Sequence, residues 1–160
     1  MDNRKSLRLK NHDYCRPGSY FVTTCVLNHH CYFGDIRDGK MTHNQCGEIA
    51  LQQIKWLSDH YPYVDVRVYS VMPNHVHAII DIKPVKGDIK LLSLPQLMAA
   101  YKTRVSTAIH NMGMREFAWQ RSYYDHIIRN SSGYEKIAEY ITTNLSNWPQ
   151  DRFYKPTPQA

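Results

Sequence analysis

The chain has 160 residues, 42% of them hydrophobic, which suits a single domain over residues 1–160 with a sizeable core. It has no apolar stretch of the roughly 18 residues that span a membrane, no signal peptide and no C-x-x-C cysteine pair, so we expect a cytoplasmic protein without membrane contact, disulfides or a zinc ribbon. The net charge of +6 favours a polyanionic partner, with nucleic acid the first candidate.

The first part of the chain predicts a strand, a hairpin and a helix. Residues 1–17 form a basic N-terminal arm, and residues 18–26 have the β-branched and aromatic content of a buried strand. The following stretch predicts a loop or small hairpin that turns at residues 38–39. Apolar side chains at helical spacing then predict a helix over residues 46–60.

The middle of the chain predicts two strands, a long helix and a further strand. The two strands cover residues 64–71 and 75–82, and a tight turn joins them because proline and asparagine both favour turns. The helix covers residues 93–111, with a proline near its start and apolar side chains at heptad-like intervals. Residues 123–129 alternate in a way that suits the last strand.

A third helix is predicted over residues 131–144, opening at Ser131 with a serine and a glutamate placed as in a capping box. Residues 145–160 contain three prolines and predict an extended tail over the surface. The order strand, helix, strand, strand, helix, strand is the ferredoxin-like arrangement. It is an α+β fold with an antiparallel sheet and two helices on one face. The third helix is additional and is expected across the other face.

His75 and His77 are separated by one apolar residue within the predicted strand 75–82. Side chains in a strand alternate, so both imidazoles point the same way and form a potential pair of metal ligands. Val76, with Ala78 and Ile80, is expected to pack into the core on the opposite face. For an isolated His-x-His pattern, two half-exposed strand histidines are the simpler explanation.

Tyr140 and Asn144 lie four residues apart in the predicted third helix, so their side chains share one face. Two imidazoles, one amide oxygen and open positions can hold a divalent ion beside a tyrosine nucleophile, which suits phosphodiester cleavage. A tyrosine with a pKa near 10 needs such help, because its phenolate is scarce at neutral pH. On spacing alone, a tyrosine on a half-buried helix face is the simpler explanation. His126 and Tyr123 or Tyr124 are rivals for catalysis, but base stacking or core packing suits them better.

Positive charge gathers in the N-terminal arm, after the predicted strand 75–82, and near the aromatic residues 119–124. Interleaved arginines and aromatic rings can hold phosphates and stack unpaired bases. For any single residue, a solvated basic surface is the simpler explanation. The candidate DNA contacts are Arg4, Lys5, Arg8, Lys10, Lys83, Lys86, Arg121, Tyr123 and Arg129.

Three separated motifs, at residues 71–77, 119–130 and 139–144, resemble the single-tyrosine HUH transposases, and in particular the REP-associated tyrosine transposases. The similarity extends from Tyr20 to Tyr154 and so covers nearly the whole chain. It implies a divalent metal cofactor, Mg²⁺ or Mn²⁺. The residues that match the family's functional positions are His75, His77 and Asn144 as metal ligands and Tyr140 as the nucleophile.

The resemblance implies breakage and rejoining of single-stranded or hairpin DNA by a bacterial, nucleoid-associated enzyme. Tyr140 would form a 5′-phosphotyrosine linkage and release a 3′-hydroxyl, and a later 3′-hydroxyl attack would rejoin the strands. Leu145 departs from the proline that many relatives carry, and family members work either as a monomer or as a homodimer. The alternatives are a domesticated, sequence-specific DNA-binding protein with weak or no cleavage and a metal-dependent hydrolase of small phosphate esters.

Overall fold

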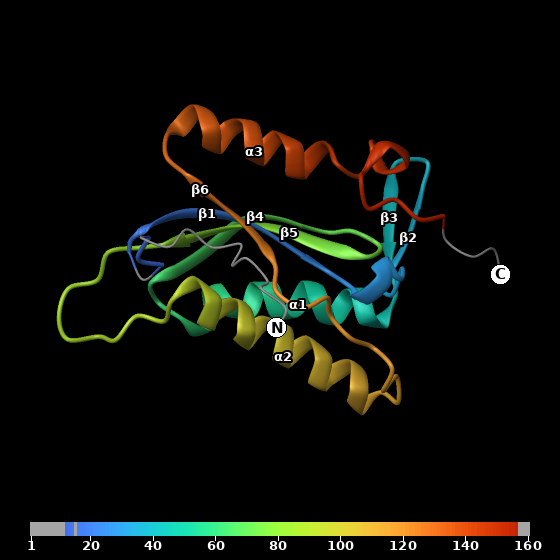
Figure 1. The fold of residues 1–160 in the computed structure, drawn as a ribbon, viewed down its shortest axis with the longest axis horizontal. Helices are drawn as coiled ribbons and strands as arrows, with labels where there is room; N and C mark the ends of the chain where they lie inside the picture. The colour runs from blue at the N-terminus through green and yellow to red at the C-terminus, as the bar shows by residue number, and fades with distance from the viewer. Residues whose placement is uncertain (1–11, 15, 157–160) are drawn as a thin grey trace, which may run out of the picture.

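The computed structural model describes residues 12–14 and 16–156. Its central layer is a four-stranded antiparallel sheet in the order β4-β5-β1-β6 (Figure 1). The strands are β1 (Gly18–Cys25), β4 (Val64–Val71), β5 (His75–Ile82) and β6 (Tyr124–Ile128). The helices α1 (Gln45–His60) and α2 (Leu94–Asn111) lie on one side of the sheet, and α3 (Ser131–Thr143) lies on the other (Figure 1).

This arrangement confirms the predicted ferredoxin-like α+β fold with an extra helix that carries Tyr140. A hairpin of β2 (Gly34–Arg37) and β3 (Lys40–His43) is inserted between β1 and α1. It turns where expected, because Asp38 and Gly39 both have positive φ values, 52° and 72°, as a tight hairpin turn requires. The other elements in the described part of the chain are two short 3₁₀ helices, η1 (Leu27–His29) and η2 (Trp148–Gln150).

The hydrophobic core fills the space between the sheet and the pair α1 and α2. Val76, Ala78 and Ile80 of β5 belong to it and are at most 2% exposed, as strand alternation predicts. The opposite face of β5 is therefore left to His75, His77 and the residues that follow at the same spacing. Register fixes the position of this face, because β5 pairs with β1 along its whole length.

Two predictions were wrong in their details. The cap of α3 is Asn130 rather than the serine of the predicted capping box, since the Asn130 side chain accepts a hydrogen bond from the Gly133 N–H. Asparagine and serine cap helices about equally well, so neighbouring candidates could not be told apart by pattern. Residues 145–156 are also not an extended surface tail: Trp148 is 3% exposed and the side chain of Asp151 is 1% exposed.

Most of the predicted basic arm falls outside the described part of the chain. The predicted DNA contacts Arg4, Lys5, Arg8 and Lys10 lie outside the described residues. Within residues 12–14 and 16–156, no helix combines the length and the apolar character needed to cross a membrane.

Candidate active site

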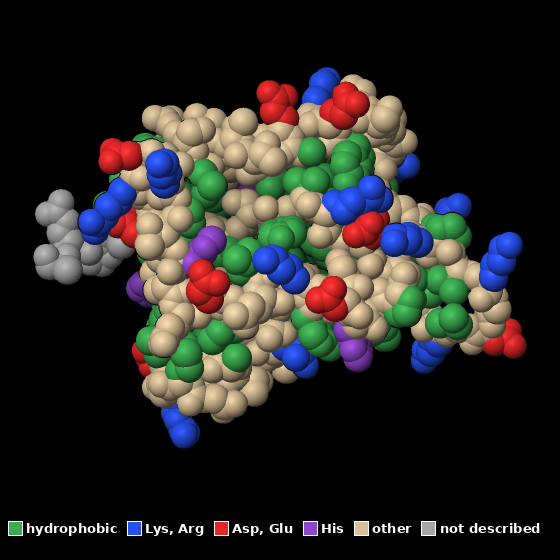
Figure 2. Space-filling view, turned by 180° about the vertical axis from the view of Figure 1, so that it is seen from behind, with side chains coloured by type: hydrophobic (Ala, Val, Ile, Leu, Met, Phe, Trp, Pro, Cys, Tyr) green, Lys and Arg blue, Asp and Glu red, His purple; other side chains and the backbone are tan. Residues whose placement is uncertain are grey.

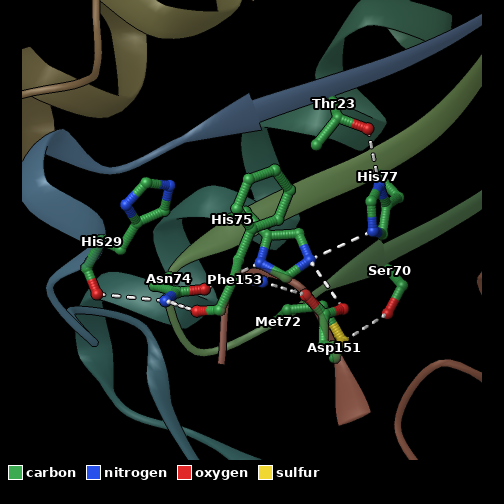
Figure 3. A network of polar contacts seen from close by, with 9 residues as sticks. All are labelled: Thr23, His29, Ser70, Met72, Asn74, His75, His77, Asp151 and Phe153. Atoms are coloured by element: carbon green, nitrogen blue, oxygen red, sulfur yellow. Dashed lines mark hydrogen bonds and ion pairs between the residues drawn. The ribbon is translucent and has the colours of Figure 1, made fainter. Parts of the chain in front are cut away.

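Strand β5 places His75 and His77 beside each other on the sheet face that looks toward α3 (Figure 3). The two residues are 0% and 2% exposed, and their Nε2 atoms are 3.0 Å apart. Neighbouring ligands of an octahedral ion with bonds of roughly 2.1 Å are themselves about 3 Å apart. The spacing of the two nitrogens therefore fits a shared divalent ion.

The tautomer of His75 is set by Asn74, the residue before it. Nδ2 of Asn74 donates hydrogen bonds to the backbone carbonyls of His29 (3.0 Å) and Phe153 (2.7 Å). Its Oδ1 consequently faces Nδ1 of His75 at 2.7 Å (Figure 3). Because an amide oxygen only accepts, Nδ1 of His75 carries the proton and donates it. Nε2 of His75 is left with its lone pair directed toward His77.

His77 is held by the neighbouring strand β1. Its Nδ1 lies 2.8 Å from the hydroxyl of Thr23, and the ring of Phe21 stacks on its ring with centroids 5.5 Å apart. Burial lowers the pKa of His75 to about 3, with a smaller contribution from His29, and burial also lowers the pKa of His77. Both imidazoles are therefore neutral at neutral pH, which is the form that binds metal ions.

Asp151 is a further potential ligand that the sequence patterns did not indicate. Its Oδ2 lies 3.6 Å from Nε2 of His75 and has no hydrogen-bond partner among the described residues. His75, His77 and Asp151 offer ligand atoms that all lie within 4.8 Å of one another. Asp151 follows η2 in a stretch without strand or helix periodicity, so no local pattern indicated it. Two neutral imidazoles and an unpaired, buried carboxylate oxygen fit a divalent cation.

Tyr140 projects from α3 toward the histidine pair. Its ring centroid is 5.4 Å from that of His77 and 6.2 Å from that of Phe21, yet the residue is 45% exposed. Partial burial, and then the carboxylate of Asp151, raise the pKa of the Tyr140 hydroxyl. The phenol is thus protonated at neutral pH, and an attack by its oxygen requires that the proton be lost.

Asn144 is the C-terminal capping residue of α3 and is 3% exposed. Its Nδ2 atom is buried and has no hydrogen-bond partner in the described part of the chain. The amide therefore lies inside the protein rather than in solvent, and its predicted role as a metal ligand stays a prediction.

The predicted DNA contacts differ in accessibility. Lys83, Lys86, Arg121 and Arg129 are all exposed, and Lys83 also lies 3.7 Å from the carboxylate of Asp65. On the face in Figure 2, Lys and Arg side chains lie among Asp and Glu side chains rather than in one continuous basic patch.

Tyr123 belongs to the hydrophobic core. It is 6% exposed, and the accessible tyrosine is its neighbour Tyr124, which is 38% exposed. A contact of Tyr123 with DNA would require its ring to leave the core. The burial of Tyr123 agrees with the core packing that was one of its two expected roles, its contact with DNA stays a prediction, and the accessible ring at this point belongs to Tyr124.

The fold and the site define a ferredoxin-like α+β protein with a buried histidine pair facing a tyrosine-bearing helix. A family model described as "Transposase IS200 like" matches residues 23–144. The chain belongs to this IS200-like transposase family, and so to a class of proteins that act in DNA recombination.

Two individual proteins show the extent of the similarity. An uncharacterized protein of Haemophilus influenzae (strain ATCC 51907 / DSM 11121 / KW20 / Rd) is 34% identical over 170 aligned positions, which cover 96% of this chain and 94% of that protein. A solved structure of a REP-associated tyrosine transposase bound to a REP hairpin has the same fold, with a TM-score of 0.61 and 20% identity. The match covers 96% of this chain and 91% of that one.

Proposed function

We propose that this protein cleaves and rejoins single-stranded DNA next to hairpins, with Tyr140 as the nucleophile. A divalent ion, Mg²⁺ or Mn²⁺, would be held by His75, His77 and Asn144. The observation that carries the proposal is the position of Tyr140, whose ring lies 5.4 Å from that of His77 while 45% of the residue is open to solvent. The tyrosine is therefore accessible to a phosphate from solvent, while its ring lies directly beside the buried histidine pair.

The ion, when bound, would neutralise charge on a non-bridging phosphate oxygen and so make the phosphorus easier to attack. The protein's own side chains prepare the site for this. Asn74 holds the proton of His75 on Nδ1, which leaves Nε2 free to bind. Thr23 fixes the ring of His77, and Phe21 packs against both that ring and the ring of Tyr140.

In the cleavage step, the hydroxyl oxygen of Tyr140 forms a bond to phosphorus and its proton passes to solvent. The bond from phosphorus to the 3′-oxygen of the upstream nucleotide breaks, and that oxygen takes up a proton to become a 3′-hydroxyl. The downstream strand stays attached to Tyr140 through its 5′-phosphate. A later attack by a 3′-hydroxyl reverses the exchange, and one ester bond replaces another without an outside energy source.

Hairpin DNA is the proposed partner for two reasons. The REP-associated transposase with the same fold is bound to a REP hairpin. This chain has a net charge of +6, and Lys86, Arg121 and Arg129 are exposed for contact with phosphates.

The test uses 3′-end-labelled, single-stranded oligonucleotides made from palindromic DNA that flanks the gene. The protein is incubated with Mn²⁺ or with EDTA, and products are separated on a denaturing protein gel. A labelled covalent band is expected only with metal, and it should be absent in Tyr140→Phe. Tyr124→Phe is the matched control, because Tyr124 is also exposed and loses only its hydroxyl. DNA that is retarded on a native gel without any covalent band would contradict cleavage and favour binding alone.

A further inference from the structure

We propose that Asp151 supplies a further protein ligand, besides His75, His77 and Asn144, to the ion at the histidine pair, so that ion binding holds residues 148–153 against strand β5. This inference rests on the proposed function, because it concerns the same ion. It goes further in naming a ligand outside the strand and the helix that carry the other candidates.

Several hydrogen-bond acceptors lie close together beside His75, and the described residues offer too few N–H and O–H donors for each acceptor to receive a hydrogen bond. Asn74 fixes the proton of His75 on Nδ1, so Nε2 of His75 presents a lone pair. His77 can offer one N–H to that lone pair across 3.0 Å if Thr23 donates to its other nitrogen. Even in this arrangement, Oδ2 of Asp151 faces His75 at 3.6 Å with no donor among the described residues. A buried carboxylate oxygen without a donor is costly, and a cation between these atoms removes the cost.

The carboxylate of Asp151 is held in place through its other oxygen. Oδ1 accepts a hydrogen bond from the backbone N–H of Phe153 at 2.7 Å, and the carbonyl of Phe153 accepts one from Asn74 at 2.7 Å. Oδ2 alone is therefore directed at the histidines, as Figure 3 shows. This is the geometry of a carboxylate that binds an ion through one oxygen.

Aromatic rings fix the rest of the segment around His75. The ring of Phe153 lies 5.0 Å from that of His75 and stacks on His29 at 5.1 Å. Trp148, 3% exposed, lies 6.1 Å from His75. These ring contacts position the segment, and the ion would add a link between its carboxylate and the two nitrogens of β5.

The donor atoms are separated by distances close to those of one coordination sphere, and the widest separation exceeds that of opposite ligands by a few tenths of an ångström. Adjacent ligands of an octahedral ion are about 3 Å apart and opposite ligands about 4.2 Å, for bonds of roughly 2.1 Å. The three side chains have ligand atoms within 4.8 Å of one another. Two imidazoles, one amide oxygen and one carboxylate oxygen would still leave two octahedral positions open for a phosphate oxygen and water.

The experiment measures Mn²⁺ binding to the full-length protein in the absence of DNA, by titration calorimetry and by the electron paramagnetic resonance signal of free Mn²⁺. Asp151→Asn should weaken Mn²⁺ binding at least tenfold, because the amide keeps the shape of the side chain but not its charge. Asp81→Asn is the matched control. Asp81 lies on β5 at the same side-chain spacing as the histidines and is also a carboxylate of low exposure, but it is not part of the ligand group.

A second readout follows the segment itself. Hydrogen exchange of residues 148–153 should slow when Mn²⁺ is added to the wild-type protein and to Asp81→Asn, but not when it is added to Asp151→Asn. Asp151→Cys tests whether weaker Mn²⁺ binding in Asp151→Asn comes from the loss of a ligand or from a folding defect. A thiolate at this position should raise affinity for Cd²⁺ relative to Mn²⁺, an effect that a purely structural role of Asp151 would not produce.

The outcomes separate this inference from the proposed function. Equal Mn²⁺ affinity of wild type and Asp151→Asn would overturn the role of Asp151, and a Tyr140-dependent covalent band would leave the proposed function standing. Absence of Mn²⁺ binding in the wild-type protein, together with absence of the covalent band, would overturn both.

Discussion

Asn74 joins three parts of the chain that are far apart in sequence. Its amide nitrogen donates to His29, which precedes the hairpin, and to Phe153, which follows η2, while its oxygen accepts from His75. The residue is 0% exposed, so these polar groups have to be satisfied within the protein. The geometry of the histidine pair thus depends on an uncharged side chain that takes no part in the chemistry.

Asn74→Ala should lower the free energy of unfolding by about 2 kcal/mol, because it leaves buried carbonyl groups and the N–H of His75 without partners. Urea unfolding followed by circular dichroism, in EDTA, measures this change. Asn147→Ala is the control, since Asn147 makes no side-chain cap hydrogen bond, and its effect should stay within about 0.5 kcal/mol. Equal effects of the two substitutions would contradict the role assigned to Asn74.

Cys25, at the end of β1, should resist alkylation in the folded protein. Burial raises the pKa of its thiol to about 12. At pH 8 roughly one such thiol in ten thousand is ionised, against about one in four at the ordinary pKa of about 8.5. Mass spectrometry after iodoacetamide treatment should find Cys25 modified in urea but not in buffer. Cys31 is only partly buried and serves as the internal comparison, and equally fast labelling of both in buffer would show that this end of β1 is open.

At the level of helices and strands, two glycines occupy equivalent places with different surroundings. Gly47 in α1 and Gly133 in α3 are each the third helical residue, and each donates its N–H to the capping asparagine, Asn44 or Asn130. A Cβ atom on Gly47 would lie 2.1 Å from the carbonyl oxygen of Phe33, so the hairpin passes too close to α1 for a side chain. On Gly133 it would meet the Asn130 side chain at 3.2 Å.

Gly47→Ala should therefore destabilise the protein by about 2 kcal/mol or more, because the backbone clash outweighs the roughly 1 kcal/mol that alanine contributes to a helix. Gly133→Ala should change stability by less than about 1 kcal/mol, since a side-chain oxygen can move by a few tenths of an ångström. Thermal unfolding of both variants compares them. A more stable Gly47→Ala protein would mean that the segment before β2 can withdraw from α1.

Sequence patterns predicted the individual helices and strands better than the tertiary contacts between them. The facing of His75 and His77 follows from strand alternation alone, and the position of Tyr140 on its helix follows from local spacing. Asp151 joins them through a tertiary contact that has no periodic signal. Tyr123 is buried and Tyr124 is exposed, and the sequence did not distinguish them for a related reason. A shift of one residue in register reverses which side chain faces the core, and β6 is too short for its pattern to define the register.

For the molecule as a whole, the net charge of +6 predicts DNA binding that weakens as salt rises. Fluorescence anisotropy with a labelled single strand should show affinity falling at least about tenfold between 50 and 200 mM salt. The double variant Lys83→Ala and Lys86→Ala should reduce the slope of log K against log salt by about 1.4, or about 0.7 for each phosphate that a lysine no longer neutralises. Lys55→Ala, on the exposed side of α1, is the control. An affinity independent of salt would contradict a phosphate-binding surface.

The residues of the site come from both early and late stretches of the chain: Thr23 in β1, the histidines in β5, Tyr140 in α3 and Asp151 after η2. They are synthesised in that order, since the N-terminal part of a chain emerges from the ribosome first. The sheet strands β1, β4 and β5 can pair while Tyr140 is still untranslated. A prematurely terminated product that ends before α3 would present the histidine pair with no tyrosine beside it, so incomplete translation would yield a product that lacks the proposed nucleophile.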